Sequence, residues 1–220
     1  MAMKINWLKR TLKAPVRFRT SKGFGVHSPF AYSFITRVLR ESLPYYAYSD
    51  QKCRYTDLKN NSLKHPFLNL KRIRLLFRPV NYFNPASALQ IGSDCGLVTS
   101  ALLDVNSEMN IFRFACDDVF SAPGVSVCNC IDNAKNADLV IVVTAESFHL
   151  QIFDFLKNAI LEEKPLIFPC IDHNSDIADI WVRLNSFADD LGYGMTFTNY
   201  RFGIIVPQKR LPRQLFSVWL

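Results

Sequence analysis

The sequence predicts an α/β fold in which helices cover both faces of a mostly parallel sheet. Short, nearly continuous apolar runs recur after residue 86, and stretches with helical periodicity separate them. One of these runs leads through a glycine-bearing turn into the start of a helix. A chain of 220 residues, 49% of them hydrophobic, is long enough for one good-sized core. We therefore expect a single α/β domain over 81–220, preceded by a basic helical extension over 1–80.

The extension is expected to be mainly helical. Residues 1–22 are basic with interspersed apolar residues, and a helical stripe there is expected to end at Pro15. A longer helix is expected to begin at Ser28, a suitable N-cap residue followed by Pro29, and to run to about residue 43. The remaining expectations for this part are a loop or irregular helix over 45–62 and a helix over 66–77.

The domain is expected to contain seven strands, at 88–91, 111–116, 125–131, 139–143, 166–170, 196–200 and 202–206. Helices fit at 97–104, 147–162 and 175–191. The last two strands are separated by Arg201 alone, which predicts an antiparallel hairpin at the end of the chain.

The segment between the second and fourth strands is short. From Asp118 to Asp138 there is too little chain for two helical crossovers. The turn residues Ala122-Pro-Gly124 therefore predict a reversal of direction. On this interpretation, strand 125–131 lies antiparallel to strand 111–116.

The segment from Ala86 to Gly96 is the strongest indication of a ligand site. A short buried strand ends at Gly92, a tight loop reaches a second glycine at Gly96, and a helix-like run begins at Leu97. Such a unit holds nucleotide-like ligands in α/β proteins, because glycines let backbone N–H groups approach the ligand at a helix start. We expect a binding site at this loop.

Together with these features, six short segments resemble the class I, Rossmann-like S-adenosylmethionine-dependent methyltransferases. The resemblance is closest to a bacterial group of methyltransferase-like proteins with an N-terminal helical extension. It spans roughly residues 22–206. The segments are Gly25-Val-His-Ser-Pro-Phe30, Leu43-Pro-Tyr-Tyr46, Leu75-Leu-Phe-Arg78, Ala88-Leu-Gln-Ile-Gly92, Ile171-Asp-His173 with Trp181, and Phe202-Gly-Ile-Ile205.

The resemblance implies S-adenosylmethionine as the cofactor and methyl transfer to an oxygen of a small or conjugated acceptor. The residues that it assigns to cofactor binding are Gln90, Gly92, Ser93, Asp94, Gly96, Asp117 and Asp118. For the two adjacent aspartates the alternative is that they simply end a strand in solvent.

Two departures from the family pattern favour a second interpretation. Gln90 stands where active relatives carry an acid, and Thr144 and Ala145 stand where an Asp-Gly pair is usual. The alternative function is therefore a non-catalytic methyltransferase-like scaffold or binding protein.

Three further side chains are candidates for chemistry. Asp172 and His173 follow the strand 166–170, at the edge of an open α/β sheet where ligands bind, and such a pair can act as a general base. The alternative for this segment is helix capping by Asn174 or Ser175. The resemblance places His27 near the mouth of the site as a substrate contact; its alternative is a hydrogen-bonded cap of the following helix.

The net charge of +7 is unevenly distributed. Residues 1–80 hold 17 Lys and Arg against three acids, whereas residues 81–220 hold nine against 16, and the first 40 residues contain no acid. This asymmetry predicts either that residues 1–22 contact a polyanion, such as nucleic acid or an anionic surface, or that the basic segment packs against the acidic body.

Several classes of protein are disfavoured by the sequence. No apolar run approaches the roughly 18 residues that span a bilayer, and the first residues have too short an apolar stretch for a signal peptide. The six cysteines are scattered without paired metal-ligand spacing, so no metal site is expected. We expect a cytoplasmic protein with reduced cysteines.

Overall fold

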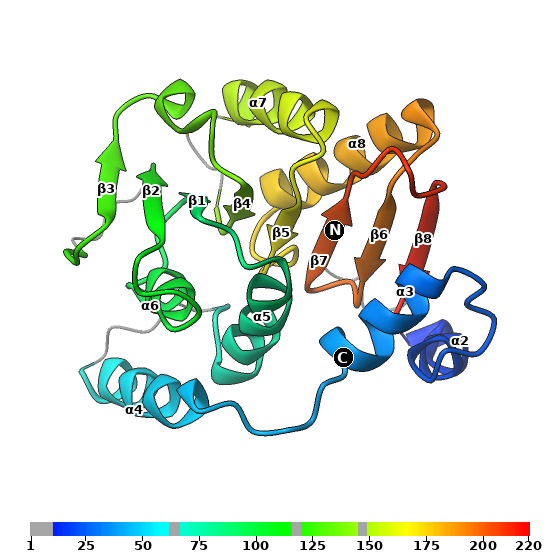
Figure 1. Ribbon diagram of the computed structural model, residues 1–220, viewed down its shortest axis with the longest axis horizontal. Coiled ribbons are helices and arrows are strands. Elements are labelled where there is room, and N and C mark those ends of the chain that lie inside the picture. Colours follow the sequence, from blue (N-terminus) through cyan, green and yellow to red (C-terminus); the bar gives the residue numbers. More distant parts are fainter. Residues whose placement is uncertain (1–10, 62–66, 116–119, 145–148) are drawn as a thin grey trace.

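The computed structural model describes residues 11–61, 67–115, 120–144 and 149–220 (Figure 1). Its centre is a mixed sheet of eight strands in the order β3-β2-β1-β4-β5-β7-β6-β8. The strands are β1 (Ser87–Ile91), β2 (Asn110–Phe114), β3 (Val125–Cys128), β4 (Leu139–Val142), β5 (Leu166–Phe168), β6 (Met195–Thr198), β7 (Gly203–Val206) and β8 (Gln214–Ser217).

The predicted fold class is confirmed. Strands β1 to β5 are mutually parallel, and β7 lies antiparallel to both β5 and β6. The expected C-terminal hairpin is therefore present. The sequence analysis missed β8, which pairs in parallel with β6 and forms the edge of the sheet.

The expected direction of the third strand is wrong. β3 runs parallel to β2, with Ile111 opposite Val125 and Phe114 opposite Cys128. Because β2 ends at Phe114 and β3 ends at Cys128, the connections 115–124 and 129–138 are longer than the sequence analysis assumed. At about 3.3 Å per residue, either connection reaches about 30 Å, enough to return along the sheet without a helix. The segment between β2 and β4 is still short, as predicted. In their described parts, the two connections contain no helix except the 3₁₀ turn η2 (Ile131–Ala134).

Helices lie on both faces of the sheet (Figure 1), and a hydrophobic cluster is buried under the helices of each face. Successive residues of a strand point to opposite faces, so Ala88 belongs to one cluster and Leu89 to the other. The first face is covered by α3 (Pro29–Ser33), the π-helical turn η1 (Phe34–Leu39), α5 (Leu70–Phe83) and α6 (Leu97–Leu103). The second face is covered by η2, α7 (His149–Leu161) and α8 (Ser175–Leu191).

The N-terminal part differs from expectation in three places. A helical segment that includes Thr11 and Leu12 ends in a turn at Lys13, before Pro15, as expected, but a second helix that was not expected, α2 (Ala14–Ser21), begins there. Proline suits the first turn of α2 because its missing N–H has no helical partner there in any case. Residues expected as a loop or irregular helix form α4 (Ala47–Asn60). Helix α5 continues through Pro79 to Phe83, since burial of Pro79 and Val80 outweighs the cost of proline in a helix.

The described residues were also compared with the expectations on membrane spans, disulfides and metal sites. No helix in the described ranges is long and apolar enough to cross a membrane. None of the described cysteines forms a disulfide. Within the same ranges, no three metal-ligating side chains gather in one place.

Candidate functional site

The glycine loop lies at the carboxyl end of β1, between β2 and β4. Gly92 and Gly96 both adopt positive φ angles, of 88° and 75°, which residues other than glycine rarely adopt. The Gly92 N–H donates to the carbonyl oxygen of Phe114 at 2.9 Å, which fastens the start of the loop to the end of β2. Helix α6 then begins directly after Gly96. The predicted strand–loop–helix unit is therefore present in the structure.

Gln90, on β1, stabilises this loop through hydrogen bonds of its side chain. Its side chain is fully buried, and its Nε2 donates to the carbonyl oxygen of Gly92 at 3.1 Å. Its Oε1 accepts a hydrogen bond from the Thr99 hydroxyl at 2.7 Å. The neutral amide thus connects the loop to helix α6.

Asp94 forms a buried cap on helix α6. Its carboxylate accepts hydrogen bonds from the backbone N–H groups of Gly96 and Thr99, each at 3.0 Å, and from that of Val98. Arg113 on β2 places Nη2 3.3 Å from Asp94 Oδ1, and both side chains are fully buried. The sequence analysis missed Arg113; a lone arginine inside an apolar strand is the signal that indicates a buried ionic partner.

Two side chains lie directly against the glycines. A Cβ on Gly92 would stand 2.1 Å from Thr144 Oγ1 and 2.6 Å from the Thr144 backbone nitrogen. A Cβ on Gly96 would stand 2.5 Å from a ring carbon of Phe120, and the Arg113 guanidinium lies 5.8 Å from the centre of that ring. Other parts of this chain therefore occupy the space that the missing glycine side chains leave open. Phe120 fills the space beside Gly96, and Thr144 fills the space beside Gly92.

Asp172 lies at the same edge of the sheet, after β5, and is held by two arginines. Arg72 Nη2 on α5 lies 2.8 Å from Asp172 Oδ2, and Arg201 Nε, in the turn between β6 and β7, lies 3.4 Å from the same oxygen. The side chains of Asp172 and Arg72 are only 15% and 12% exposed. Asp172 is therefore an ion-pair partner and is poorly placed to act as a free general base.

Two polar atoms of this ion pair make no hydrogen bond to the described residues. Asp172 Oδ1 and Arg72 Nη1 are both buried, and neither has a hydrogen-bond partner among the described residues. One buried hydrogen-bond acceptor and one buried donor at the carboxyl edge of the sheet are thus unsatisfied among the described residues.

Charge in this cluster is well defined. Burial lowers the pKa of Arg72, but its hydrogen bond and charge interaction with Asp172, together with Cys170, outweigh this effect and raise it overall. Burial raises the pKa of the Cys170 thiol to about 11, against a smaller lowering by Arg72. The arginine is therefore cationic and the thiol neutral at ordinary pH.

His173 lies beside this cluster, with its ring edge-on to Phe67 at a centroid distance of 4.7 Å. It does not cap the following helix. That role belongs to Asn174, whose Oδ1 accepts from the Ile177 N–H at 2.9 Å. His173 thus remains the base candidate at this edge.

His27 lies near the amino end of strand β6, at the opposite end of the strands from the glycine loop. It is exposed and adjacent to Ser28, whose hydroxyl caps α3 and lies 4.0 Å from the sulfur of Met195 at the start of β6. Because β6 runs in the same direction as β1, the start of β6 and the glycine loop are at opposite ends of the strands. The structure therefore does not bring His27 together with Gly92, and the expected ribose partners Asp117 and Asp118 lie outside the described residues.

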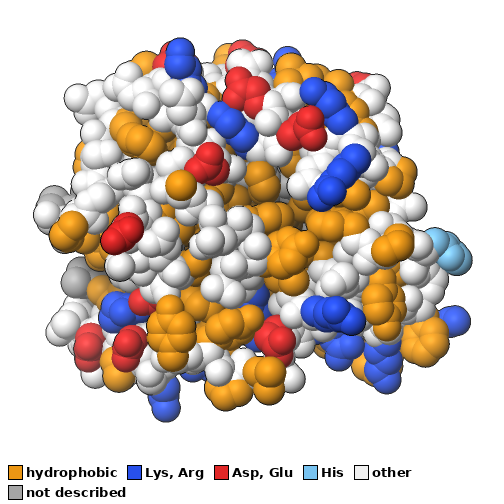
Figure 2. Space-filling view, in the orientation of Figure 1, with side chains coloured by type: hydrophobic (Ala, Val, Ile, Leu, Met, Phe, Trp, Pro, Cys, Tyr) orange, Lys and Arg blue, Asp and Glu red, His pale blue; other side chains and the backbone are white. Residues whose placement is uncertain are grey.

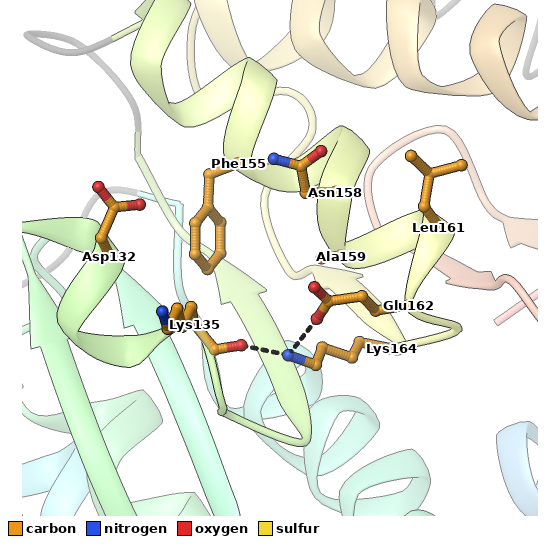
Figure 3. A pocket seen from close by; sticks show the side chains of 8 residues that line it. All are labelled: Asp132, Lys135, Phe155, Asn158, Ala159, Leu161, Glu162 and Lys164. Carbon is orange, nitrogen blue, oxygen red and sulfur yellow. Dashed lines mark hydrogen bonds and ion pairs between the residues drawn. The ribbon is translucent and has the colours of Figure 1, made fainter.

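A hollow of about 270 Å³ also lies away from the glycine loop (Figure 3). Lys135 precedes β4 and Lys164 precedes β5, which places the hollow near the amino ends of these strands. The Lys164 ammonium group is already bonded to Glu162 and to the Lys135 carbonyl oxygen. The hollow is therefore separate from the candidate site. Its lining residues are Asp132, Lys135, Phe155, Asn158, Ala159, Leu161, Glu162 and Lys164.

Comparisons with known proteins give matches at the level of structure. No protein-family model matches the sequence, and no curated protein matches it. A caffeoyl-CoA O-methyltransferase candidate from Staphylococcus aureus superposes with a TM-score of 0.51 at 10% identity, covering 71% of this chain and 91% of that one.

Two further structures are similar to a lesser degree. An O-methyltransferase candidate from Klebsiella pneumoniae has a TM-score of 0.48 at 9% identity, with coverage of 77% of this chain and 92% of that one. The SAH-bound methyltransferase PaMTH1 of Podospora anserina has a TM-score of 0.44 at 11% identity, covering 76% and 98%. The strand order and the Staphylococcus match together show that this chain has the class I methyltransferase fold.

Proposed function

We propose that this protein is an S-adenosylmethionine-dependent methyltransferase that holds its cofactor at the loop from Gly92 to Gly96. The observation that carries the proposal is the shape of this loop, with two positive-φ glycines between the end of β1 and the start of α6. The fold places the loop at the carboxyl edge of a parallel sheet, where open α/β sheets bind ligands. The methyl group that the cofactor supplies would pass to an oxygen atom of a small or conjugated acceptor.

The chain's own residues would act mainly by positioning. Methyl transfer depends on aligning the nucleophile with the methyl group and sulfur, so few catalytic groups are required. Asp172 Oδ1 and Arg72 Nη1, which are buried, would hold polar groups of the acceptor once its arrival opens this cluster. His173, which lies next to them, is the proposed base, and Asp117 or Asp118 the proposed ribose partner. A cytoplasmic location is part of the same proposal, supported by the described cysteines, which form no disulfide.

A non-catalytic scaffold is the second candidate, and one observation favours it. Thr144 and Phe120 occupy the faces of Gly92 and Gly96 that a ligand would approach. Asp94 and Arg113 neutralise one another in the interior beside the loop. On this interpretation the loop is preserved for packing alone.

Titration calorimetry with S-adenosylhomocysteine and S-adenosylmethionine separates the two candidates. We expect micromolar binding by the natural chain. The Phe120→Ala variant is expected to bind about tenfold more tightly, because the closed state no longer competes with the ligand. Phe24→Ala, which removes an exposed ring on the N-terminal segment, is the matched control and should bind like the natural chain.

Absence of heat at millimolar ligand in both the natural chain and Phe120→Ala would overturn the enzyme and support the scaffold. Weaker binding by Phe120→Ala than by the natural chain would show that the ring is a wall of the site. In that case the cofactor assignment would stand and the expected competition between Phe120 and the ligand would be wrong.

A further inference from the structure

Helix α2 has its polar and apolar sides reversed relative to an ordinary surface helix. Its buried residues are Arg17 and Ser21, whereas Val16 and Phe18 are 61% and 50% exposed, and Leu12, just before the helix, is 73% exposed. Phe24, in the turn that follows, is 62% exposed. Clustered apolar side chains that point outward on a folded element indicate an interaction surface rather than a core.

The same surface is strongly basic. Lys13, Arg19 and Lys22 are exposed between the apolar side chains, and the first 40 residues contain no acid. In Figure 2 the lower right of the molecule, over α2 and α3, shows blue and orange side chains with no red among them. A partner that complements this surface would carry negative charge and also accept apolar side chains.

The surface is held rigidly on the body of the protein. Arg17 donates from Nε and Nη2 to the Val218 carbonyl oxygen, at 3.1 and 3.0 Å, and its guanidinium lies 5.1 Å from the centre of the Trp219 ring. The Ser21 hydroxyl accepts a hydrogen bond from the Trp219 N–H at 2.5 Å. Because α2 is ordered before any partner arrives, binding would not have to offset the entropy of folding it.

We propose that α2 and the turn Gly23–Gly25 dock this protein on an anionic lipid surface. The exposed Leu12, Val16 and Phe24 would enter the interfacial region of the bilayer, while Lys13, Arg19 and Lys22 would pair with lipid phosphates. Lipid fits better than nucleic acid for two reasons. Leu12 and Val16 are aliphatic and offer no ring for stacking on bases, and the Phe18 ring is covered by the Lys22 ammonium group at 4.4 Å, so that among these apolar residues Phe24 alone presents an open ring. The proposal does not depend on the methyltransferase assignment.

Co-sedimentation of the full chain with vesicles tests this proposal. We expect binding to vesicles of phosphatidylglycerol and phosphatidylcholine in roughly equal parts, and little binding to phosphatidylcholine alone. The double variant Lys13→Gln, Lys22→Gln should bind roughly 25-fold more weakly, at about fivefold per cation. The double variant Val16→Asn, Phe24→Asn should lose at least about tenfold, because the apolar side chains supply the insertion.

Matched controls use residues of equal exposure elsewhere. Lys52→Gln with Lys59→Gln removes two exposed lysines from α4, and Val182→Asn removes a valine on α8 that is also 61% exposed. Neither change should alter vesicle binding by more than about twofold.

Three outcomes would overturn the proposal. The first is binding of the natural chain to the anionic vesicles that is no stronger than to phosphatidylcholine. The second is full affinity in Val16→Asn, Phe24→Asn, which would show that attraction is purely electrostatic. The third is tighter binding to a single-stranded oligonucleotide than to the vesicles at the same salt concentration, lost in the lysine variant, which would identify nucleic acid as the partner.

Discussion

At the scale of single residues, two glycines decide how closely the chain can approach itself at the candidate site. Gly92 and Gly96 have positive φ angles, and both lie within van der Waals contact of other parts of the chain. The sequence analysis predicted both glycines as loop residues that leave room for a ligand. It did not identify Phe120 as the group that fills this room, because Phe120 and Gly96 are far apart in the sequence and only the fold brings them together.

The cost of a side chain at Gly92 can be measured against a glycine of similar backbone geometry. Gly192 has a φ of 73°, and a Cβ there would meet nothing within 4 Å. We expect Gly192→Ala to lower the free energy of unfolding by about 1 kcal/mol, the cost of the left-handed conformation alone. Gly92→Ala should lower it by about 3 kcal/mol or more, because its Cβ also collides with Thr144. Urea denaturation of both variants checks this, and equal losses would show that Thr144 yields without cost.

At the scale of elements, helix α6 depends on a buried ionic cap rather than on its own length. It is a short helix, Leu97–Leu103, and the Asp94 carboxylate accepts two of its otherwise unsatisfied N–H groups, those of Val98 and Thr99, and also that of Gly96 just before it. The Arg113 guanidinium compensates the buried charge. The sequence predicted the helix and assigned Asp94 to the cofactor, whereas in this structure the carboxylate is occupied within the protein.

Removing this cap should be costly. Asp94→Asn deprives the buried Arg113 of its anionic partner, and we expect the free energy of unfolding to fall by about 3–5 kcal/mol. The added change Arg113→Met should restore part of that loss, because it removes the uncompensated charge. Asp179→Asn, which breaks an exposed pair with Arg183 on α8, is the control and should cost less than about 0.5 kcal/mol. Chemical denaturation of the natural chain and these three variants gives the comparison. A loss of less than about 1 kcal/mol in Asp94→Asn would refute the capping role.

Helix α8 was predicted correctly from local signals, whereas the direction of strand β3 was not. The predicted helix over 175–191 coincides with α8, since its apolar periodicity and its Asn174 cap are both local signals. The direction of β3 was predicted wrongly, because an estimate of reach depends on where neighbouring strands end. Those ends are determined by pairing between strands, through the register of β2 with β3, and not by the apolar runs themselves.

At the scale of the whole molecule, the two ends of the chain are joined. Arg17 on α2 and Val218, just after β8, are 201 positions apart and share two hydrogen bonds. Arg17 is only 1% exposed, and its guanidinium also faces the rings of Trp219 and Tyr200. The N-terminal segment is thereby fastened to the edge of the sheet that the sequence analysis did not predict.

Loss of this contact should loosen both ends together. We expect Arg17→Ala to lower the free energy of unfolding by about 2–3 kcal/mol, from the loss of charged hydrogen bonds and cation–π contacts. Arg19→Ala, an exposed arginine on the same helix, should change it by less than about 0.5 kcal/mol. Urea denaturation measures both, and limited proteolysis should cut near residue 22 faster in Arg17→Ala only. Equal behaviour of the two variants would show that α2 is not fastened through Arg17.

The sequence by itself determined the features that depend on neighbouring residues. These are the alternation of strands and helices, the C-terminal hairpin and the strand–glycine–helix unit at Gly92, since periodicity, capping and turn chemistry act over a few positions. Only the tertiary structure decided what fills the glycine loop, which way β3 runs, and that α2 buries Arg17 while exposing Val16 and Phe18. Each of these depends on contacts between distant segments, and their free energy is set by packing and burial in the assembled molecule.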